Sequence, residues 1–532
     1  MGTYLNPGNS GFAEILKSDY VDKTGLLRVI NRVIGTKKKL ICMSRPRRFG
    51  KSYAAQMLCA YYDKSCKSDQ LFKKYEIAGD ESYEQHLNQY DVIYWDMTGI
   101  KPYTGKFKTL VEFLIRNLTD EIKRQYPIVE EKEDLSATLV DAVEKVGNKF
   151  VIVIDEWDAP IRENPVVQEE YLEFLRSLFK NSGTTSKIFA AAYMTGILPI
   201  KKDDNQSAVS DFVEYTVLEP GDLAYYVGFT EDEVRECCEK SGQSFEKMKK
   251  WYDGYTIGEK HSLYNPYSVM QAIDSGRYKS YWKKTSAAET LMTYIDMNQE
   301  GLQADVARLI AGESVEVDTD SFQNDVETFT CKDDVLTLLI HLGYLTYEEV
   351  SDSYNEDDDI VTGMARIPNE EVRTEFEKIL RKAKHQGLTA LVKRSDQLLR
   401  DTLDGNEVAV AQAIEEVHES EYAPTFYNNE QSLRYVIKMA YISCVDQYAK
   451  VEELPSGHGI ADVVFLPKRR SVLPAMMIEL KWNKDAEGAL RQIKDRNYPK
   501  ILKNFGGEIV LVGVNYDENT KTHDCKIEIY KG

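Results

Sequence analysis

The segment from residue 40 to residue 62 constrains the fold of this chain more than any other part. Residues 40–43, Leu-Ile-Cys-Met, form an apolar run that predicts a buried parallel strand. The chain breaks this run at Pro46, reaches Gly50-Lys51-Ser52 and continues with a helical pattern. The large side chains of that helix are expected to share one face: Tyr53, Met57, Leu58, Tyr61 and Tyr62. Strand, loop and helix in this order predict one unit of an α/β fold with a parallel sheet.

This layout is also that of a phosphate-binding P-loop. Backbone N–H groups and the positive end of the following helix attract phosphate oxygens. Gly50 allows close approach of the backbone, Lys51 would reach the β- and γ-phosphates of ATP, and Ser52 would ligate Mg²⁺. The expected nucleotide-binding residues run from the loop into the first helical turn: Arg45, Pro46, Arg47, Arg48, Phe49, Gly50, Lys51, Ser52 and Tyr53.

One position departs from the usual P-loop pattern. The pattern opens with a glycine, and this chain has Arg45 there. A Gly-Lys-Ser triplet by itself also fits a polar turn before a helix, so both interpretations stay open on this segment alone.

A second segment, about a hundred residues later, favours the P-loop. Phe150 to Ile154 are apolar and lead directly into Asp155 and Glu156, which predicts a buried strand with acids at its C-terminal end. Ligands of parallel α/β sheets bind at that edge. Asp155 would hold Mg²⁺ and Glu156 would orient the attacking water. The alternative is a strand that runs into an acidic loop. Thr195, which ends the next strand, is a candidate γ-phosphate sensor or else a cap.

The alternation of strands and helices predicts a doubly wound parallel sheet for residues 1–218. Residues 219–390 are predicted to form a helical lid and a winged-helix-like extension, in which residues 333–350 run from a helix into a strand and 365–368 return. The tip at 351–359 is acidic and lacks Lys and Arg, so a packing role is favoured over DNA recognition. Residues 391–532 are predicted to form a third domain.

Composition indicates a protein of the cytoplasm. Hydrophobic residues make up 42% and charged residues 29%, with a net charge of −20. No apolar run approaches the roughly 18 residues of a membrane helix, and the first residues lack a signal pattern, so no membrane association is expected. The eight cysteines have no zinc-site spacing. The acidic balance counts against a broad electrostatic grip on nucleic acid, although it leaves room for a local basic groove.

A second cluster of chemically active residue types lies at residues 459–481. Two apolar strands are joined by a basic turn; Asp462 opens the first, and Glu479 and Lys481 close the second. Because side chains alternate along a strand, Glu479 and Lys481 share a face, and hairpin pairing would place Asp462 beside Glu479. Two carboxylates and a lysine suit phosphodiester hydrolysis, with Mg²⁺ or Mn²⁺ held by Asp462 and Glu479. Lys481 would orient water or stabilise developing charge.

Neighbouring helices add candidates to this cluster. Glu430 could supply a third carboxylate, and Gln492 and Tyr498 could face the same site. Residues 455–504 contain ten Lys or Arg and five Asp or Glu, a local net charge of +5 in an acidic chain. The alternative is an edge hairpin with an ordinary Glu-Lys ion pair, because a D…ExK pattern is short and common.

Several spaced motifs resemble known families. YVDKT, RPRRFGKS, VIVIDEWDAP, MTGILPI, WYDGY and LYNPYSV are similar to a family of predicted bacterial and archaeal AAA-type ATPases. GIADVVFLP, MMIELK and ALRQIKDRNY resemble the PD-(D/E)XK nuclease superfamily domain, which has a restriction-endonuclease-like α/β fold. The first resemblance implies ATPase roles for Lys51, Ser52, Asp155 and Glu156, in a family whose P-loop commonly begins Arg-Pro. The second implies nuclease roles for Asp462, Glu479, Lys481, Gln492 and Tyr498.

The function expected from these observations is an ATPase whose nucleotide state gates a metal-dependent nuclease acting on DNA rather than RNA. The alternative is a nucleotide-controlled switch that binds a protein partner, with the C-terminal domain as a docking module. A plain ATPase motor in a homo-oligomeric ring is a third hypothesis. Arg162 and Arg176 follow the acidic strand and are candidate arginine fingers, or else ordinary exposed arginines.

Overall fold

The structure is a computed structural model. It describes residues 2–98, 100, 109–200, 211–257, 261–282, 302–320, 322, 329, 331–349, 362–382, 386–419, 430–442, 444, 448–456, 459–467, 473–495 and 508–531. The chain forms two compact units, Met1–Ala287 with Glu316–Thr374 and Ala288–Val315 with Glu375–Gly532. The predicted division into three domains at residues 218 and 390 remains a prediction.

The first unit is built around a five-stranded sheet in the order β2-β3-β4-β1-β5, in which every pair of neighbours is parallel. The strands are β1 (Leu40–Ser44), β2 (Asp91–Asp96), β3 (Phe150–Asp155), β4 (Phe189–Gly196) and β5 (Val213–Tyr215). β1, β3 and β4 are buried along their whole length, as expected for a parallel sheet covered on both faces. This confirms the α/β fold and the parallel sheet.

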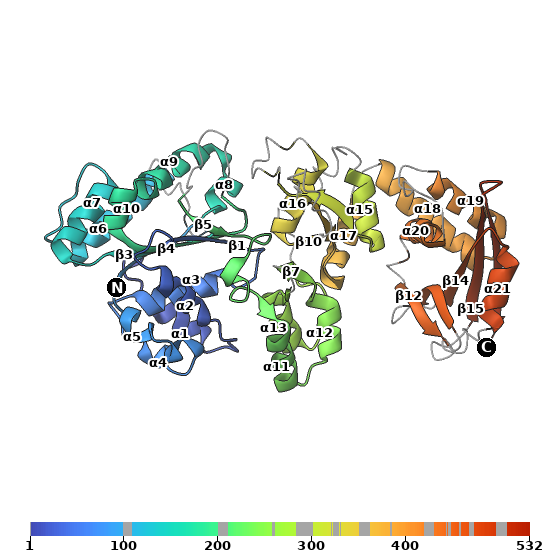
Figure 1. The fold of residues 1–532 in the computed structure, drawn as a ribbon, viewed down its shortest axis with the longest axis horizontal. Helices are drawn as coiled ribbons and strands as arrows, with labels where there is room; N and C mark the ends of the chain where they lie inside the picture. The colour runs from blue at the N-terminus through green and yellow to red at the C-terminus, as the bar shows by residue number, and fades with distance from the viewer. Residues whose placement is uncertain are drawn as a thin grey trace, which may run out of the picture. The chain divides into compact units, whose positions relative to one another are not determined.

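Helices cover both faces of this sheet (Figure 1). One face carries α1 (Ser10–Ile15), α2 (Gly25–Val33), α3 (Lys51–Tyr62), α4 (Asp69–Phe72) and α5 (Tyr83–His86). The other carries α6 (Leu110–Gln125), α7 (Leu135–Val146), α8 (Ala159–Glu163), α9 (Gln168–Phe179) and α10 (Ser182–Ile188). Short 3₁₀ turns lie at Glu76–Gly79, Pro165–Val167 and Gly221–Leu223.

The helices of the sheet domain follow from apolar spacing and capping residues. In α6, Leu110, Leu114, Leu118 and Ile122 recur every four residues and are all buried. Thr109 caps this helix by accepting the N–H of Glu112, which stabilises its first turn at Leu110. In α3, Tyr53 is 53% exposed while Met57, Leu58, Tyr61 and Tyr62 are buried, so the prediction of one shared face is wrong for Tyr53. Tyr53 lies in the first helical turn, where Ser52 is exposed too.

The rest of the first unit contains two small sheets with their helices. β6 (Phe229–Thr230), β8 (His261–Tyr264) and β7 (Tyr255–Ile257) form one sheet beside α11 (Glu231–Ser241), α12 (Phe245–Tyr252) and α13 (Pro266–Ser275). The other has the order β10-β11-β9, from Thr346–Glu349, Thr362–Arg366 and Val315–Asp318, next to α16 (Lys332–Leu342). Tyr252, Tyr255 and Tyr264 are buried and belong to the core of this region. The predicted acidic tip at 351–359 lies outside the described residues.

The second unit contains a mixed five-stranded sheet in the order β12-β13-β14-β15-β16. Only β14 and β15 are parallel, and α21 connects them. The strands are β12 (Tyr448–Ser456), β13 (Gly459–Pro467), β14 (Ala475–Trp482), β15 (Glu508–Asp517) and β16 (Thr522–Lys531). The helices are α15 (Leu302–Ala311), α17 (Glu370–Lys382), α18 (Gln386–Leu403), α19 (Glu407–His418), α20 (Glu430–Ala440) and α21 (Ala486–Asp495), with α17 starting in the first unit.

Candidate functional sites

The carboxyl ends of β1, β3 and β4 bring the first set of predicted residues together. These strands are neighbours in the sheet, and their ends carry the P-loop, Asp155 with Glu156, and Thr195. Gly50 stands before α3 with a φ of +95°, a left-handed conformation that glycine adopts without strain. The chain therefore turns at Gly50 and enters α3 at Lys51.

The Lys51 ammonium is held inside this site. It is 3% exposed, and Nζ donates to the carbonyl oxygens of Arg45 and Pro46 at 3.1 Å each. Nζ also lies 3.2 Å from Oε1 of Glu156. The loop backbone thus positions a buried cation at the helix N-terminus, the place at which a phosphate oxygen is most stabilised.

Asp155 and Thr195 form a second, buried contact. The Thr195 hydroxyl donates to Oδ1 of Asp155 at 2.6 Å and accepts the N–H of Glu156 at 3.2 Å. Burial raises the pKa of Asp155, while hydrogen bonds from Thr195 and Ser52 act in the opposite direction. The structure therefore brings Ser52, Asp155 and Thr195 together. A hard cation at this point would find the oxygens of Ser52 and Asp155 as protein ligands.

Glu156 is restrained by two cations and by its own backbone. Lys51 contacts Oε1, and Nη2 of Arg162 donates to Oε2 at 3.1 Å. The φ of Glu156 is +52°, an uncommon value for a non-glycine residue and one that is found at functional sites. Both carboxylate oxygens of Glu156 are therefore held in ion pairs with side chains of this chain.

Arg162, a candidate arginine finger from the sequence, lies at this site together with Asp158, which the sequence did not single out. Nε of Arg162 donates to Oδ2 of Asp158 at 2.8 Å, and Asp158 also accepts the N–H groups of Ile197 and Leu198. Asp158 and Arg162 are four residues apart, the spacing of an ion pair along a helix. That spacing in the sequence could have indicated the pair of Asp158 and Arg162. The contact of Arg162 with Glu156 depends on the turn between β3 and α8, which the spacing does not reveal.

The remaining loop residues differ in where their side chains lie. Arg45 is fully buried, and its guanidinium donates to the carbonyl oxygens of Ser44, Tyr215 and Thr216. Burial lowers the pKa of Arg45 to about 10. The Arg45 side chain therefore binds backbone carbonyl groups at and next to β5. Arg45 contacts the Lys51 ammonium through its backbone carbonyl. Burial, followed by the charge of Arg162, lowers the pKa of Arg47, while the carboxylates of Glu156 and Asp158 act in the opposite direction.

Pro46, Arg48 and Phe49 contact the second part of the first unit. Phe49 packs edge-on against Tyr255 with ring centroids 5.1 Å apart. Arg48 has a φ of +70°, donates to the carbonyl of Tyr281 and stacks over the ring of Tyr267. A Cβ added to Gly343 would meet Pro46 at 2.7 Å. The loop that precedes Gly50 is thus an internal interface as well as a candidate phosphate site.

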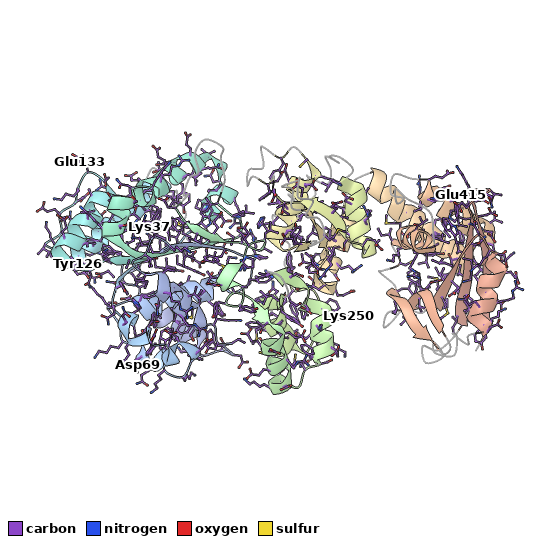
Figure 2. The ribbon with its side chains drawn as sticks, in the orientation of Figure 1. Lys37, Asp69, Tyr126, Glu133, Lys250 and Glu415 are labelled. Atoms are coloured by element: carbon purple, nitrogen blue, oxygen red, sulfur yellow. The ribbon has the colours of Figure 1, made fainter. Side chains whose placement is uncertain are left out.

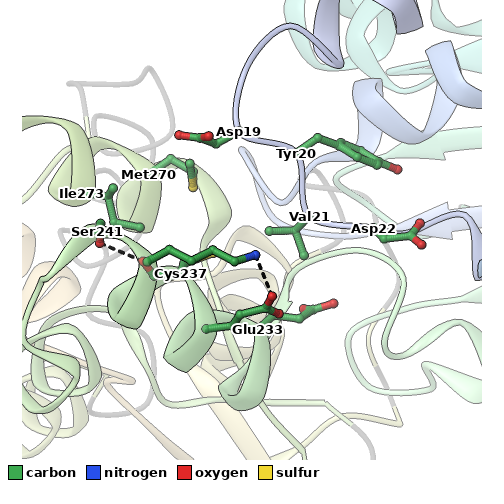
Figure 3. Close-up of a pocket in the computed structure, with 11 residues that line it drawn as sticks. Asp19, Tyr20, Val21, Asp22, Glu233, Cys237, Ser241, Met270 and Ile273 are labelled. Carbon is green, nitrogen blue, oxygen red and sulfur yellow. Dashed lines mark hydrogen bonds and ion pairs between the residues drawn. The ribbon is translucent and has the colours of Figure 1, made fainter. Parts of the chain in front are cut away.

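A separate cavity of about 450 Å³ lies between the segment before α2 and the helices α11 and α13 (Figure 3). Its walls include Val21, Met270 and Ile273. Its carboxylates are Asp19, Asp22, Glu233 and Glu236, and Glu236 pairs with Lys240 at 2.6 Å. No predicted site residue of the described chain lines it. The excess of carboxylates would repel a phosphate, so this cavity does not fit the phosphates of a nucleotide.

The second unit gathers the other predicted cluster on β13, β14 and α21. Pairing of Val463 with Ile478 sets the antiparallel register, and Oδ2 of Asp462 accepts the N–H of Leu480 at 2.9 Å. Lys481 Nζ lies 3.3 Å from Oε1 of Glu479, which confirms that these two side chains share a face. Glu479 is 2% exposed. The structure therefore places both carboxylates and the lysine at one end of the hairpin.

Gln492 reaches the same cluster from α21. Its amide Nε2 donates to Oε1 of Glu479. α21 packs on β14 and β15 through Ala489, Leu490 and Ile493, and Gly513 on β15 leaves room for the carbonyl of Ala486. This close approach brings Gln492 over Glu479. Tyr498 lies outside the described residues, as does the side chain of Glu430.

Each candidate metal site rests on two protein side chains. Within the described residues, no group of three or more His, Cys, Asp or Glu side chains gathers in a way that would hold a metal ion. Mg²⁺ is commonly held by one or two carboxylates together with substrate phosphates and water. The pairs Ser52 with Asp155 and Asp462 with Glu479 fit that mode, because all their donor atoms are hard oxygens.

Comparisons with solved structures give weak global likeness. The structure of the Aeropyrum pernix ORC1 protein in complex with DNA has a TM-score of 0.28 at 10% identity, over 68% of this chain and 94% of that chain. The Aeropyrum pernix ORC2 protein in its ADPNP-ADP complexes has a TM-score of 0.26 at 11% identity, over 67% and 93%. The structure of C. elegans PCH-2 has a TM-score of 0.20 at 9% identity, over 68% and 67%. Scores this low carry no conclusion about function.

Comparison with family models identifies both parts of the chain. No curated protein matches it. No helix in the described ranges has the length and apolar character needed to cross a membrane. The predicted AAA-ATPase family model matches residues 7–205, and the PD-(D/E)XK nuclease superfamily model matches residues 428–525. Domains of these kinds generally use ATP and divalent metal ions. The chain is thus a fusion of a predicted AAA-ATPase domain with a PD-(D/E)XK nuclease superfamily domain.

Proposed function

We propose that this protein hydrolyses ATP and that its nucleotide state gates a metal-dependent nuclease acting on DNA. The observation that carries the proposal is the presence of two separate sets of catalytic residue types in one chain. One is the cluster of Lys51, Asp155 and Thr195, and the other is the cluster of Asp462, Glu479 and Lys481.

In the ATPase site, Lys51 would move from Glu156 and the loop carbonyls to the β- and γ-phosphates. Ser52 and Asp155 would hold Mg²⁺, which supplies charge neutralisation for the phosphates when bound. Glu156, once released by Lys51 and Arg162, would orient the attacking water. Thr195 would keep Asp155 and the backbone of Glu156 in register with the end of β4.

In the nuclease site, Asp462 and Glu479 would hold the divalent ion, which polarises the scissile phosphate when bound. Lys481 lies beside Glu479 and would orient water or stabilise the negative charge that develops on the phosphate. Gln492 would keep the Glu479 carboxylate in position. Tyr498 and the basic residues of 468–470 and 491–500 are proposed to contact the nucleic acid.

Gating would pass through the loop that precedes Gly50. Pro46, Arg48 and Phe49 contact the part of the first unit that contains Tyr255, Tyr281 and Gly343. Movement of the loop on nucleotide binding would therefore shift these contacts. A nucleotide-controlled switch with a non-cleaving C-terminal docking module is the alternative function.

Two parallel assays test the proposal. Cleavage of single-stranded DNA, double-stranded DNA and RNA is measured in Mg²⁺ or Mn²⁺ for the wild type and for Asp462→Ala, Glu479→Ala and Lys481→Ala. ATP hydrolysis is measured for the wild type, Lys51→Ala and Glu156→Gln. Loss of cleavage in the first group and of hydrolysis in the second supports the proposal. Cleavage that persists in Asp462→Ala would contradict the nuclease assignment.

A further inference from the structure

Arg434 contacts the nuclease cluster from a helix that precedes it. α20 carries Arg434, and Nη2 donates to Oδ1 of Asp462 at 2.7 Å. Both side chains are mostly buried, with 21% and 16% of their areas exposed. The apolar face of α20, with Leu433, Val436 and Ile437, is buried and fixes the helix from which Arg434 extends. The ion pair is therefore a fixed contact between α20 and β13.

This contact occupies the carboxylate proposed to hold a metal ion. Oδ2 of Asp462 accepts the N–H of Leu480, and Oδ1 is taken by the guanidinium. Glu479 has its own partners, Lys481 and Gln492. Asp462 and Glu479 are thus each neutralised by a different cation of the chain. A divalent ion that binds Asp462 therefore competes with Arg434 for Oδ1.

A displaced guanidinium needs another anion, because a mostly buried charge without a partner is costly. The anion expected at a nuclease site is the phosphodiester of the substrate, and a planar guanidinium matches two phosphate oxygens well. When a phosphate pairs with Arg434 in place of Asp462, the Asp462 carboxylate becomes available to the metal ion.

We propose that Arg434 is a positioning residue that couples metal binding to nucleic-acid binding. In the free protein it pairs with Asp462 and weakens metal binding, and a bound phosphodiester removes it from Asp462. Because coupling between two ligands is reciprocal, metal and nucleic acid strengthen each other's binding through Arg434. The inference rests on the proposed nuclease function.

The test measures metal binding by the full-length protein in the absence of nucleic acid. Mn²⁺ affinity is determined by calorimetry for the wild type, Arg434→Gln, Arg434→Lys and Asp462→Ala. The Mn²⁺ site that is lost in Asp462→Ala is assigned to the nuclease cluster. Arg434→Gln is expected to tighten this site about tenfold, since a charged hydrogen bond no longer competes. The Mn²⁺ affinity of Arg434→Lys is expected to lie between those of the wild type and Arg434→Gln.

The matched control is Arg400→Gln. Arg400 is an exposed arginine of the same unit, and its Nε and Nη2 donate to the neutral side chain of Gln397. This variant is expected to bind Mn²⁺ like the wild type. Circular dichroism establishes that the Arg434 variants are folded, and Arg434→Lys keeps the test open if Arg434→Gln is not.

The second readout is coupling. Ca²⁺ affinity is measured with and without a short DNA duplex. DNA is expected to tighten Ca²⁺ binding in the wild type and to have a smaller effect in Arg434→Gln. An Asp462-dependent Mn²⁺ site that is no tighter in Arg434→Gln overturns the inference and leaves the proposed nuclease standing. Absence of any Asp462-dependent site in all variants overturns the proposed metal site itself.

Discussion

Thr195 shows how one hydroxyl can organise the end of a parallel sheet. It donates to Asp155 and accepts from the backbone of Glu156, so it joins β4 to the two acids that follow β3. Sequence position alone suggested either a γ-phosphate sensor or a cap. The geometry adds a third role, the orientation of a buried carboxylate whose pKa is raised by burial.

Thr195→Val, which removes the hydroxyl and keeps the shape, is expected to lower kcat for ATP hydrolysis about tenfold. It should also lower the free energy of unfolding of the first unit by about 1–3 kcal/mol, because Asp155 loses a buried partner. Steady-state kinetics and urea unfolding measure the two effects. Thr195→Ser restores the hydroxyl and should behave nearly as the wild type. Full activity in Thr195→Val would contradict this role.

Two buried histidines give each unit its own pH dependence. Burial lowers the pKa of His523 to about 3, and burial, followed by the charge of Arg45, lowers that of His341 to about 4. His523 Nδ1 lies 3.8 Å from Glu415, but a histidine with so low a pKa is neutral, so the contact is not an ion pair. In the unfolded chain both would titrate near pH 6.5.

Between these folded pKa values and pH 6.5, the unfolded state binds protons that the folded state does not. The free energy of unfolding is therefore expected to fall as pH drops below 6.5, by at most about 1.4 kcal/mol per pH unit for each histidine. Thermal unfolding at pH 7.5 and 5.5 measures the loss. His341→Gln should reduce it in the first unit only, and His523→Gln in the second only. An unchanged loss in both variants would contradict the account.

At the scale of elements, α19 protects the free edge of the C-terminal sheet. β16 is an edge strand, and its outward N–H groups at His523 and Ile527 donate to the carboxylates of Glu415 and Glu407, at 3.1 Å each. Figure 2 labels Glu415 on α19. Unpaired edge N–H groups otherwise favour pairing with a strand of another chain.

The double variant Glu407→Ala, Glu415→Ala is expected to self-associate through β16. Sedimentation velocity over a range of concentrations detects this as a shift from the wild-type species to larger ones. Glu416→Ala changes an exposed residue of the same helix and serves as control. A double variant that sediments like the wild type would show that α19 is not required to protect this edge.

The elements with strong local signals were predictable from the sequence. The apolar runs at β1, β3 and β14, and the alternation that places Glu479 beside Lys481, depend on neighbouring residues only. The contacts that were missed join residues far apart. Arg434 meets Asp462 from another element, and Arg45 is drawn to carbonyl groups of residues 215 and 216. No local pattern encodes such pairs, because the packing of separate elements decides them.

For the whole molecule, the two compact units lead us to expect two steps of unfolding. ATP should stabilise the unit that contains Lys51, by about 2.7 kcal/mol at a hundredfold excess over Kd. Differential scanning calorimetry with and without ATP would show one transition shifted and the other fixed. Lys51→Ala should abolish the shift. A shift of both transitions, or one that survives in Lys51→Ala, would contradict nucleotide binding at this loop.

The central claim, that nucleotide state controls cleavage, is tested most directly by the initial rate of DNA cleavage in Mn²⁺ with ATP, with ADP and without nucleotide. We predict a several-fold difference between ATP and the other two conditions in the wild type, no response in Lys51→Ala, and no cleavage in Glu479→Ala. Equal rates in all three conditions, or an ATP response that persists in Lys51→Ala, would contradict gating. Intact ATP binding without cleavage of any substrate would instead support the nucleotide-controlled switch.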